Sequence, residues 1–456
     1  MQTKVEPKTE LFDETEGFGG RGKGTIECLK QHAVPVELFK MMPSLFLAGE
    51  SVETNDRRKV LNPYDRSVAA EVCFADGTHV EKAIDAAVGA SKSFGSWPAH
   101  KRAELLERAR NGIESRMEEF TRAIISEAGK PSSLARGETQ RCLDTFTDAA
   151  YAARSSLDSV EPLDALSSGV GRVGIVRRVP VGPVAAISPF NFPLNLVAHK
   201  VAVALAAGCP MVLKPASQTP TAALLLAEVL REAGMPNGVL SVLPTGHEAA
   251  APLSRDRRLH LLSFTGSPEV GWALKAKATR MRVLLELGGN AGNIVCEDAN
   301  LDLAAERLSV GAFAYAGQSC ISAQRIYAHR DIYPDLLEAM THHTQNRIGS
   351  GDPSRDDVIS GPVITPGDAD RITDWTRQAV DAGARVAFGG DRSGSVLQPT
   401  ILSETPESER VMAQEVFGPV VNVVPYDDLE NAFDKVNDSD FGLQAAIFTQ
   451  DIYPIT

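Results

Sequence analysis

The chain has 456 residues, of which 43% are hydrophobic and 23% are charged. A length of about three typical domains predicts two or three lobes, each with a core of its own. The 46 basic and 59 acidic side chains leave a net charge of -13, which disfavours binding to the phosphate backbone of nucleic acids. No uncharged apolar run reaches the roughly 18 residues that cross a bilayer, so we expect no membrane partner. Small-molecule chemistry is the class that remains.

The cysteines and histidines predict free thiols and no metal site. The six cysteines are Cys28, Cys73, Cys142, Cys209, Cys296 and Cys320. They form no C-x-x-C pair and have no spacing with histidine that suits zinc, which predicts reduced thiols and a cytoplasmic location. The adjacent histidines, His342 and His343, lie in a polar helical stretch, where we expect a solvated helix surface.

The first 41 residues mix acids, bases and glycines without a sustained period of 2 or 3.6. This pattern predicts a disordered arm, with Met42 as an alternative start of the functional unit. The acidic residues of this segment fit neither a secretory signal nor a transit peptide, which supports the cytoplasmic location. From Thr78 to about Tyr151 apolar residues recur at helical spacing, so we expect helices there.

From Val181 onward, short β-branched runs alternate with helical stretches. Strands are expected at 184–187, 211–213, 239–243 and 259–264. Helices are expected at 194–207, with Gly208 as the stop, and at 221–233. This alternation predicts a parallel sheet covered by helices, with ligands at the carboxyl ends of its strands. A dinucleotide-binding type of fold is the natural candidate.

A second α/β stretch predicts a second lobe. Its expected elements are a strand at 293–296, a helix at 301–313, a strand at 325–328 and a helix at 333–347. Before the first sheet, residues 169–181 alternate small, charged and β-branched side chains. Such alternation is typical of an exposed hairpin.

Cys320 is the cysteine best placed for chemistry. It lies in the small-residue loop Gly-Gln-Ser-Cys-Ile-Ser between a predicted helix and a predicted strand, where backbone amides can point at a ligand. A packing role remains the alternative for Cys320, because a buried free cysteine behaves as a small hydrophobe. The other five cysteines lie in apolar or strand-like settings, and we expect them to be packing residues.

Two further residues could assist a thiol. Glu286 is a carboxylate within the apolar run Leu-Leu-Glu-Leu-Gly-Gly, and burial there would raise its pKa into the range of a general base. The alternative is a carboxylate paired with a lysine or arginine. Asn191, between two aromatic residues in Ser-Pro-Phe-Asn-Phe-Pro, could donate to a developing oxyanion. A plain turn is the alternative for Asn191.

Two segments suit a nucleotide. After the strand that ends near Phe264, Ser267 is the expected N-cap of a helix and Pro268 its first residue, so free amides would face a phosphate. Lys214 lies at the end of the preceding strand, where it could reach a ribose or its phosphate. A solvated surface group is the alternative for this lysine.

Taken together and in this order, the segments PFNFP, VLKPASQTP, FTGSPEVG, LLELGG, GQSC and EVFGP resemble the aldehyde dehydrogenase superfamily from roughly Met42 to the C-terminus. The resemblance implies an α/β fold with a Rossmann-type parallel-sheet cofactor domain, an α/β catalytic domain and a projecting β hairpin. The implied divisions are an N-terminal arm (1–41), a dinucleotide-binding domain (42–160 and 182–288), an oligomerisation hairpin (161–181) and a catalytic domain that is C-terminally incomplete (289–456).

The resemblance also implies roles for individual residues. Cys320 would be the nucleophile, Glu286 the general base, and Asn191 an oxyanion donor together with the Cys320 backbone amide. The implied cofactor-binding residues are Ser188, Pro189, Phe190, Lys214, Ser217, Gly266, Ser267, Leu287, Glu415 and Phe417. Within this set, Lys214 would meet the adenosine ribose, Gly266 and Ser267 the pyrophosphate, and Glu415 and Phe417 the nicotinamide riboside.

The implied reaction is oxidation of a small aldehyde to a carboxylic acid with NAD or NADP. Thiolate attack gives a thiohemiacetal, hydride transfer to the nicotinamide leaves a thioester, and activated water releases the acid. Position 217 is a glutamate in many NAD-preferring relatives, and here it is Ser217. The missing carboxylate would no longer repel a 2'-phosphate, so NADP is expected to be accepted and preferred.

Strings after Glu286 and around Cys320 are similar to the branch that contains lactaldehyde, phosphonoacetaldehyde and non-phosphorylating glyceraldehyde-3-phosphate dehydrogenases. Family members continue for several dozen residues after the segment 444–451, so we expect a truncated C-terminus here, and a homodimer or homotetramer if that end is intact in the native protein. Two alternatives stay open. One is a catalytically silent NAD(P)-binding protein, and the other is a cofactor-independent esterase or thioesterase that uses Cys320.

Overall fold

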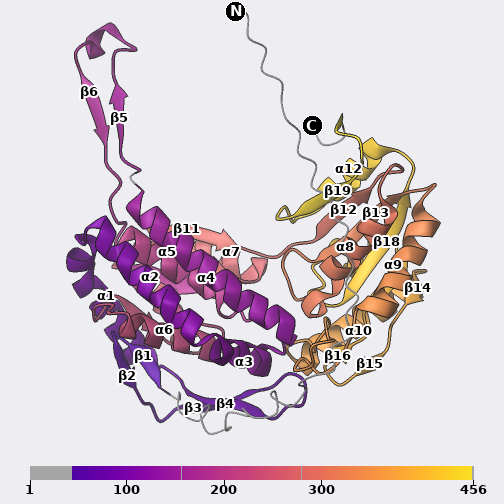
Figure 1. Cartoon of the computed structure of the whole chain (residues 1–456), viewed down its shortest axis with the longest axis horizontal. Helices are drawn as coiled ribbons and strands as arrows, with labels where there is room; N and C mark the ends of the chain where they lie inside the picture. The colour runs from indigo at the N-terminus through magenta and orange to yellow at the C-terminus, as the bar shows by residue number, and fades with distance from the viewer. Residues whose placement is uncertain (1–43, 156, 279, 454–456) are drawn as a thin grey trace, which may run out of the picture. The chain divides into compact units, whose positions relative to one another are not determined.

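Two separate β-sheets organise the part of the chain described in the computed structural model, residues 44–155, 157–278 and 280–453 (Figure 1). The expectations for residues 1–41 and for Cys28 lie outside these residues. The first sheet takes its strands from residues 45–52 and 184–286, and the second takes its strands from residues 291–448. The α/β class expected from the sequence is therefore present twice.

The first sheet consists of seven strands in the order β11-β10-β7-β8-β9-β1-β2. Their bounds are β1 (Leu45–Leu47), β2 (Glu50–Val52), β7 (Val184–Ile187), β8 (Met211–Lys214), β9 (Leu240–Val242), β10 (Leu261–Thr265) and β11 (Arg282–Glu286). Strands β7 to β11 pair in parallel. The chain moves from β7 to β8 and β9, then returns to β10 on the other side of β7. A topological switch point therefore lies between β7 and β10, where a crevice opens at the carboxyl ends of parallel strands.

Helices cover both faces of the central strands of this sheet, which explains why β7 and β8 are nearly continuous apolar runs. The helices are α1 (Gly77–Gly95), α2 (Ala99–Ser115), α3 (Met117–Ala128), α4 (Ser132–Arg154), α5 (Asn195–Ala207), α6 (Thr221–Glu232) and α7 (Pro268–Lys277), with a short 3-10 turn, η3, at Ala251–Ser254. On β8, Met211 and Leu213 join the core built by α2 to α6, while Val212 joins the core on the α1 side. Successive side chains of a strand alternate between faces, so both cores are filled from one strand.

Two antiparallel ribbons from the first half of the chain lie outside the main sheets. Strands β3 (Arg57–Leu61) and β4 (Val68–Cys73) form one of them. Strands β5 (Ser159–Pro162) and β6 (Val173–Val176) form the other, and this hairpin projects away from the helices (Figure 1). The short 3-10 turn η2 (Ser167–Gly169) lies at its tip. The projecting hairpin matches the expectation, although its pairing begins at Ser159.

The second sheet has the order β14-β17-β18-β13-β12-β19. Its strands are β12 (Ala291–Val295), β13 (Ala323–His329), β14 (Arg385–Phe388), β17 (Thr400–Ser403), β18 (Val420–Tyr426) and β19 (Ala445–Phe448), and β14 alone runs antiparallel to its neighbour. The helices are α8 (Leu301–Phe313), α9 (Tyr333–Arg347), α10 (Pro366–Asp381), α11 (Arg410–Ala413) and α12 (Leu429–Asn437), and the 3-10 turn η4 covers Ala314–Gly317. A small ribbon joins β15 (Arg392–Ser393) to β16 (Val396–Leu397).

The elements expected from periodicity are confirmed, and no end is shifted by more than two residues. The helices expected at 301–313 and 333–347 coincide with α8 and α9. Gly208 ends α5 with a left-handed backbone, as expected. Cys73, Cys142, Cys209 and Cys296 are buried free thiols, in agreement with packing roles. No helix in the described ranges is long and apolar enough to cross a membrane.

Candidate active site

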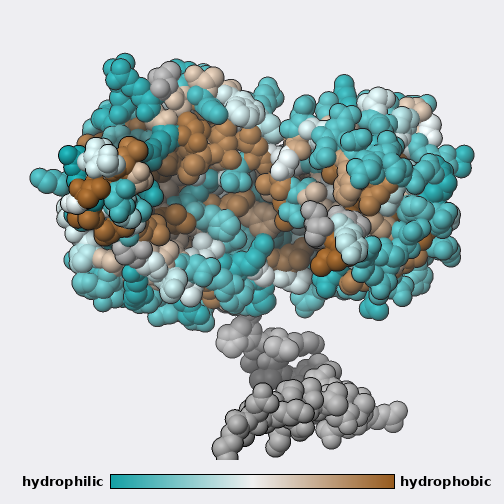
Figure 2. Space-filling model, turned by 90° about the horizontal axis from the view of Figure 1, so that it is seen from above, coloured by the Kyte–Doolittle hydropathy of each residue, from teal (hydrophilic) through white to brown (hydrophobic). Residues whose placement is uncertain are grey.

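A pocket of about 850 Å³ opens at the switch point of the first sheet. Its walls come from the segments after β7, β8 and β10 and from the loop before β13. Twelve of the thirteen predicted site residues line it: Ser188, Pro189, Phe190, Asn191, Lys214, Ser217, Gly266, Ser267, Leu287, Cys320, Glu415 and Phe417. Figure 2 shows hydrophobic surface gathered over the lobe of the first sheet, where this pocket lies, while the other lobe is mostly hydrophilic on that face.

Cys320 lies between η4 and β13, in the loop that the sequence predicted, and is half-buried. Burial raises the pKa of its thiol, and the nearby carboxylate of Glu415 raises this pKa further. The turn before the loop has three successive residues in the left-handed region, Tyr315, Ala316 and Gly317, at φ values of 54°, 53° and 65°. This conformation costs free energy for non-glycine residues, so surrounding contacts must hold the turn that leads to Cys320.

Asn191 is buried beside this loop, and its amide links the two lobes. Its Nδ2 donates to the carbonyl oxygen of Gln318 at 3.0 Å. The Gln318 side chain is itself fixed, because its Nε2 donates to the Pro362 carbonyl at 3.1 Å and its Oε1 accepts from the Ile364 amide at 2.8 Å. A primary amide has two N–H donors, so Asn191 can hold this contact and still donate to a substrate oxygen.

Glu286 does not occupy the buried position that we expected. Strand β11 is at the edge of the sheet, with β10 as its neighbour, and Arg282, Leu284 and Glu286 on one side of it are exposed. The run Leu-Leu-Glu-Leu resembled a buried central strand because periodicity cannot distinguish an edge strand with apolar residues from a covered one. Glu286 is also absent from the pocket wall, yet it is close enough to Cys320 for its charge to raise the pKa of that thiol.

Lys200 is a buried group near the site that our sequence reasoning missed. On α5, its Nζ donates to the Ser263 hydroxyl at 3.0 Å and to the Thr265 hydroxyl at 2.8 Å. Burial lowers the pKa of Lys200 to about 8, and the charge of Glu286 opposes that shift. A lysine inside the apolar helical run Asn-Leu-Val-Ala-His-Lys-Val-Ala-Val-Ala-Leu was the signal available.

The side of the pocket where adenosine is expected contains polar groups that lack strong partners. Lys214 is buried, which lowers its pKa, and its Nζ makes one long bond of 3.4 Å to the Pro215 carbonyl. The solvated alternative for this lysine is therefore wrong. The Ser188 hydroxyl is also buried and, within the described ranges, has no hydrogen-bond partner. Buried polar groups are normally satisfied, so a polar ligand such as a dinucleotide fits this wall.

The segment expected to bind the pyrophosphate has the local geometry that the sequence predicted. Ser267 is the N-cap of α7 and Pro268 is its first residue, and the Ser267 side chain makes no capping bond. A Cβ at Gly266 would come within 3.0 Å of the Phe264 ring, so this position admits only glycine without a shift of the ring. Free amides at a helix start are an anion site, which again fits a dinucleotide.

The second lobe closes the pocket from the opposite side. Glu415 Oε1 accepts the Gly289 amide at 2.9 Å, and burial raises the pKa of this carboxylate. The Phe417 ring meets the Phe190 ring edge to face, with centroids 5.8 Å apart. These two contacts bring the proposed nicotinamide end beside Cys320.

Two other groups of residues that could in principle bind a metal lie outside this pocket. His342 and His343 are on α9, where the expected helix surface is confirmed. Among the residues that the structure describes, Glu297, His329 and Asp331 bring potential metal ligand atoms close together, and none of the three lines the pocket.

Comparison with known proteins identifies the family. Residues 51–455 match the model of the Aldehyde dehydrogenase family. The 3-sulfolactaldehyde dehydrogenase of Priestia aryabhattai is 40% identical over 409 residues, which are 90% of this chain and 85% of that protein. The crystal structure of aldehyde dehydrogenase 21 from Physcomitrella patens, in complex with the reaction product succinate, has a TM-score of 0.88 at 40% identity and covers 91% of this chain and 87% of its own.

A third similar protein is the NADP-dependent glyceraldehyde-3-phosphate dehydrogenase from Bacillus halodurans, whose crystal structure contains NADP. Its structure has a TM-score of 0.87 at 32% identity, and the match covers 90% of this chain and 87% of that chain. These relatives confirm the expected superfamily, its branch and the α/β fold class. They also support aldehyde oxidation over the silent binding protein and the cofactor-free esterase. The chain belongs to the aldehyde dehydrogenase family and is an NAD(P)-dependent aldehyde dehydrogenase.

Proposed function

We propose that this enzyme oxidises a short anionic aldehyde to its carboxylic acid, with NADP preferred to NAD, and that Cys320, Asn191 and Glu286 carry the chemistry. The observation that supports the proposal is that Cys320 and Asn191 share one pocket wall with the residues expected to hold a dinucleotide. A thiol nucleophile, an amide donor and a cofactor cradle in one cavity are the parts that aldehyde oxidation needs.

In this proposal the Cys320 thiolate attacks the aldehyde carbon and forms a thiohemiacetal. Its oxyanion receives hydrogen bonds from the Asn191 side chain and from the Cys320 backbone amide. When bound, the nicotinamide supplies the acceptor for the hydride that leaves the substrate carbon. Glu286 takes the thiol proton before attack and releases it to solvent. It later takes a proton from the water that attacks the thioester, which frees the acid and the Cys320 thiolate.

The reaction assay follows the absorbance of the reduced dinucleotide with a panel of aldehydes, beside a Cys320→Ala variant. We expect turnover by the wild type and none by the variant, because the variant has no atom that can form the thioester. Turnover that survives in Cys320→Ala would contradict the assignment of the nucleophile.

The preference for NADP rests on charge at the adenosine end. Lys214 and Ser217 line the wall, and the cationic residues Arg255 and Lys277 line it too. A Ser217→Glu variant would add a carboxylate near the 2'-phosphate. At about 5 Å in water a unit charge and a dianion repel by roughly 1–2 kcal/mol, so we expect the NADP-to-NAD ratio of kcat/KM to fall about tenfold or more. Ser217→Ala is the control, and an unchanged ratio in Ser217→Glu would refute this placement.

An anionic substrate is supported by the names of the relatives and by one residue here. The relatives act on 3-sulfolactaldehyde and glyceraldehyde 3-phosphate or release succinate. In this chain the guanidinium of Arg141, on α4, lies 5.0 Å from the centroid of the Phe192 ring. Phe192 directly follows Asn191 in the sequence. Within the described ranges it forms no ion pair, and its charge lowers the pKa of the neighbouring His199 and Lys130, after the larger effect of burial.

Arg141→Met tests this assignment. We expect the variant to raise KM about tenfold for 3-sulfolactaldehyde and succinic semialdehyde, and to leave KM for uncharged propanal unchanged, because a single exposed charge contact is worth on the order of 1 kcal/mol. Arg136→Met, on the same helix, is the control, since Arg136 already pairs with Glu118. Equal effects on charged and uncharged aldehydes would refute the anion contact.

We also propose that the β5–β6 hairpin joins copies of the chain into a homodimer or homotetramer. Val160, Val173 and Ile175 on the hairpin are 68%, 63% and 74% exposed. Exposed β-branched residues on an unpaired ribbon favour pairing with another sheet edge. Light scattering should give an oligomeric mass for the wild type and a lower mass for Val173→Lys, and a monomeric wild type would refute the proposal.

A further inference from the structure

Lys130 and Glu138 form an ion pair that is almost completely buried, with side-chain exposures of 1% and 0%. Lys130 lies in the link between α3 and α4, and Glu138 lies on α4. Neither residue lines the pocket. Burial lowers the pKa of Lys130 to about 8 in spite of its partner. Since buried ion pairs are expensive and often contribute little net stability, this pair invites another explanation.

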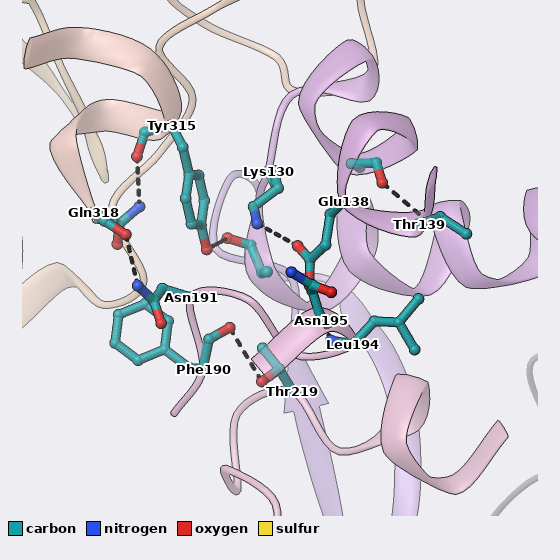
Figure 3. Close-up of polar contacts among 12 residues, drawn as sticks. Lys130, Glu138, Thr139, Phe190, Asn191, Leu194, Asn195, Thr219, Tyr315 and Gln318 are labelled. Carbon is teal, nitrogen blue, oxygen red and sulfur yellow. Dashed lines mark hydrogen bonds and ion pairs between the residues drawn. The ribbon is translucent and has the colours of Figure 1, made fainter. Parts of the chain in front are cut away.

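Glu138 holds the start of the helix that follows Asn191. Its Oε1 accepts the backbone amides of Leu194 at 2.9 Å and Asn195 at 3.0 Å (Figure 3). These are amides at the N-terminus of α5, which have no partner within the helix and favour a negative charge. Glu138 therefore fixes the point at which the segment carrying Asn191 enters its helix.

Lys130 holds the aromatic rings on both sides of the lobe boundary. Its Nζ lies 3.6 Å from the centroid of the Phe192 ring and 4.6 Å from that of the Tyr315 ring. The Tyr315 hydroxyl donates to the Ala128 carbonyl at 2.9 Å, close to Lys130 in sequence. A desolvated ammonium over two ring faces is a strong form of cation–π contact, so the cation anchors the first of the left-handed residues before Cys320.

The segment held by Glu138 and the turn held by Lys130 meet at the active site. Gln318 Nε2 donates to the Tyr315 carbonyl at 3.3 Å, and Asn191 donates to the Gln318 carbonyl at 3.0 Å. Figure 3 shows this connected set, in which Lys130 and Glu138 lie on one side and Asn191 and Gln318 on the other. Both active-site loops are thereby tied to the same buried pair.

We propose that the Lys130–Glu138 pair is a positioning device that fixes the Asn191 amide relative to the Cys320 thiol. This inference rests on the proposed roles of Cys320 and Asn191. It requires that loss of the pair weakens reactions that need an oxyanion donor, and leaves the intrinsic reactivity of the thiol intact.

The test compares two reactions of Cys320 that need no dinucleotide. Acylation by p-nitrophenyl acetate passes through an oxyanion, whereas alkylation by iodoacetamide does not. In the variant Lys130→Met/Glu138→Gln we expect acylation to slow about 10-fold to 100-fold, as a displacement of about 1 Å can cost 10²-fold, with alkylation changed less than about twofold. In steady state, kcat should fall while the KM for NADP stays, and Lys130→Arg should recover part of the loss.

The matched control is Arg136→Met/Glu118→Gln, which removes an exposed ion pair between α3 and α4, the two helices that flank the link with Lys130. It should leave both reactions unchanged. If Lys130→Met/Glu138→Gln does not fold, Glu138→Asp carries the same comparison, because its shorter carboxylate keeps the charge opposite Lys130 while it withdraws from the amides of α5.

Two results would overturn the proposal: unchanged acylation, or equal slowing of acylation and alkylation, which indicates general disruption. A wild type that is acylated at Cys320 but reduces no dinucleotide with any aldehyde would instead refute the proposed substrate and cofactor assignment. The positioning result would stand in that case, so the two failures are distinguishable.

Discussion

Replacing Gly317 by alanine should damage the enzyme far more than the same change at a glycine with the same backbone angle. Gly317 has a φ of +65°, and a Cβ there would come within 3.0 Å of the Gly418 carbonyl, a backbone atom. Gly394, in the exposed turn between β15 and β16, has a φ of +61° and nothing within 4 Å of a Cβ. Alanine at Gly394 therefore reports the backbone cost alone, and alanine at Gly317 adds the steric cost.

The expected magnitudes follow from these two contributions. A left-handed alanine costs roughly 1–2 kcal/mol, which is the loss of stability expected for Gly394→Ala. Overpacking against backbone adds about 1–3 kcal/mol, so Gly317→Ala should lose roughly 2–5 kcal/mol. Gly418 directly follows Phe417, and Cys320 lies three residues after Gly317, so a shift of about 1 Å between them should also lower kcat about 10²-fold.

Urea unfolding measures the stability of both variants, and reduced-dinucleotide absorbance measures kcat. Gly394→Ala should keep wild-type kcat. The reasoning would be refuted if Gly317→Ala matched Gly394→Ala in both measurements, because the close approach of Gly317 to Gly418 would then have no consequence.

Charged groups give three further predictions. Burial raises the pKa of Glu127 to about 8 from 4.5, so the folded chain keeps a proton that the unfolded chain loses, and stability falls as pH rises from 4.5 to about 8. Glu127→Gln should remove this slope of roughly 1.4 kcal/mol per pH unit at most, measured by urea unfolding at about pH 6 and pH 8; equal slopes in both proteins would contradict the shift. Glu415→Gln removes a charge that raises the pKa of Cys320, so iodoacetamide should alkylate Cys320 faster at a given pH while NADP binds more weakly, and an unchanged alkylation rate would count against this contact. Because burial also raises that thiol pKa, wild-type alkylation should continue to accelerate above about pH 9, and a plateau below that pH would contradict the burial of the thiol.

The elements and the pocket wall could be predicted because their signals are local. Short apolar runs with helical stretches between them gave the first sheet, and strand ends in such a sheet meet at a switch point. Cys320, Asn191 and Gly266 each follow or precede a regular element within a few residues. Once the order of elements is known, these positions must converge, so their presence in one pocket follows from topology.

The contacts that depend on packing between distant segments could not be predicted. Lys130 and Glu138 are eight residues apart in sequence, and nothing local indicates that both are buried, because their partners come from α5 and from the turn before Cys320. The exposure of Glu286 also depends on packing between distant segments. Whether β11 is covered depends on what packs beside it, and an apolar run contains no information about its neighbours.

The exposure of Glu286 is compatible with the role proposed for it. A general base in this reaction must take a proton from the Cys320 thiol and, after hydride transfer, another from water at a different place. A carboxylate fixed in a buried ion pair, as Glu138 is, would be held at one place and could not serve both. Glu286 lies at the open end of an edge strand, close enough to influence the pKa of both Cys320 and Lys200. In the proposed mechanism the site thus combines a rigidly held oxyanion donor, Asn191, with an exposed base, Glu286, and each property follows from how the sheet and its helices bury the residue.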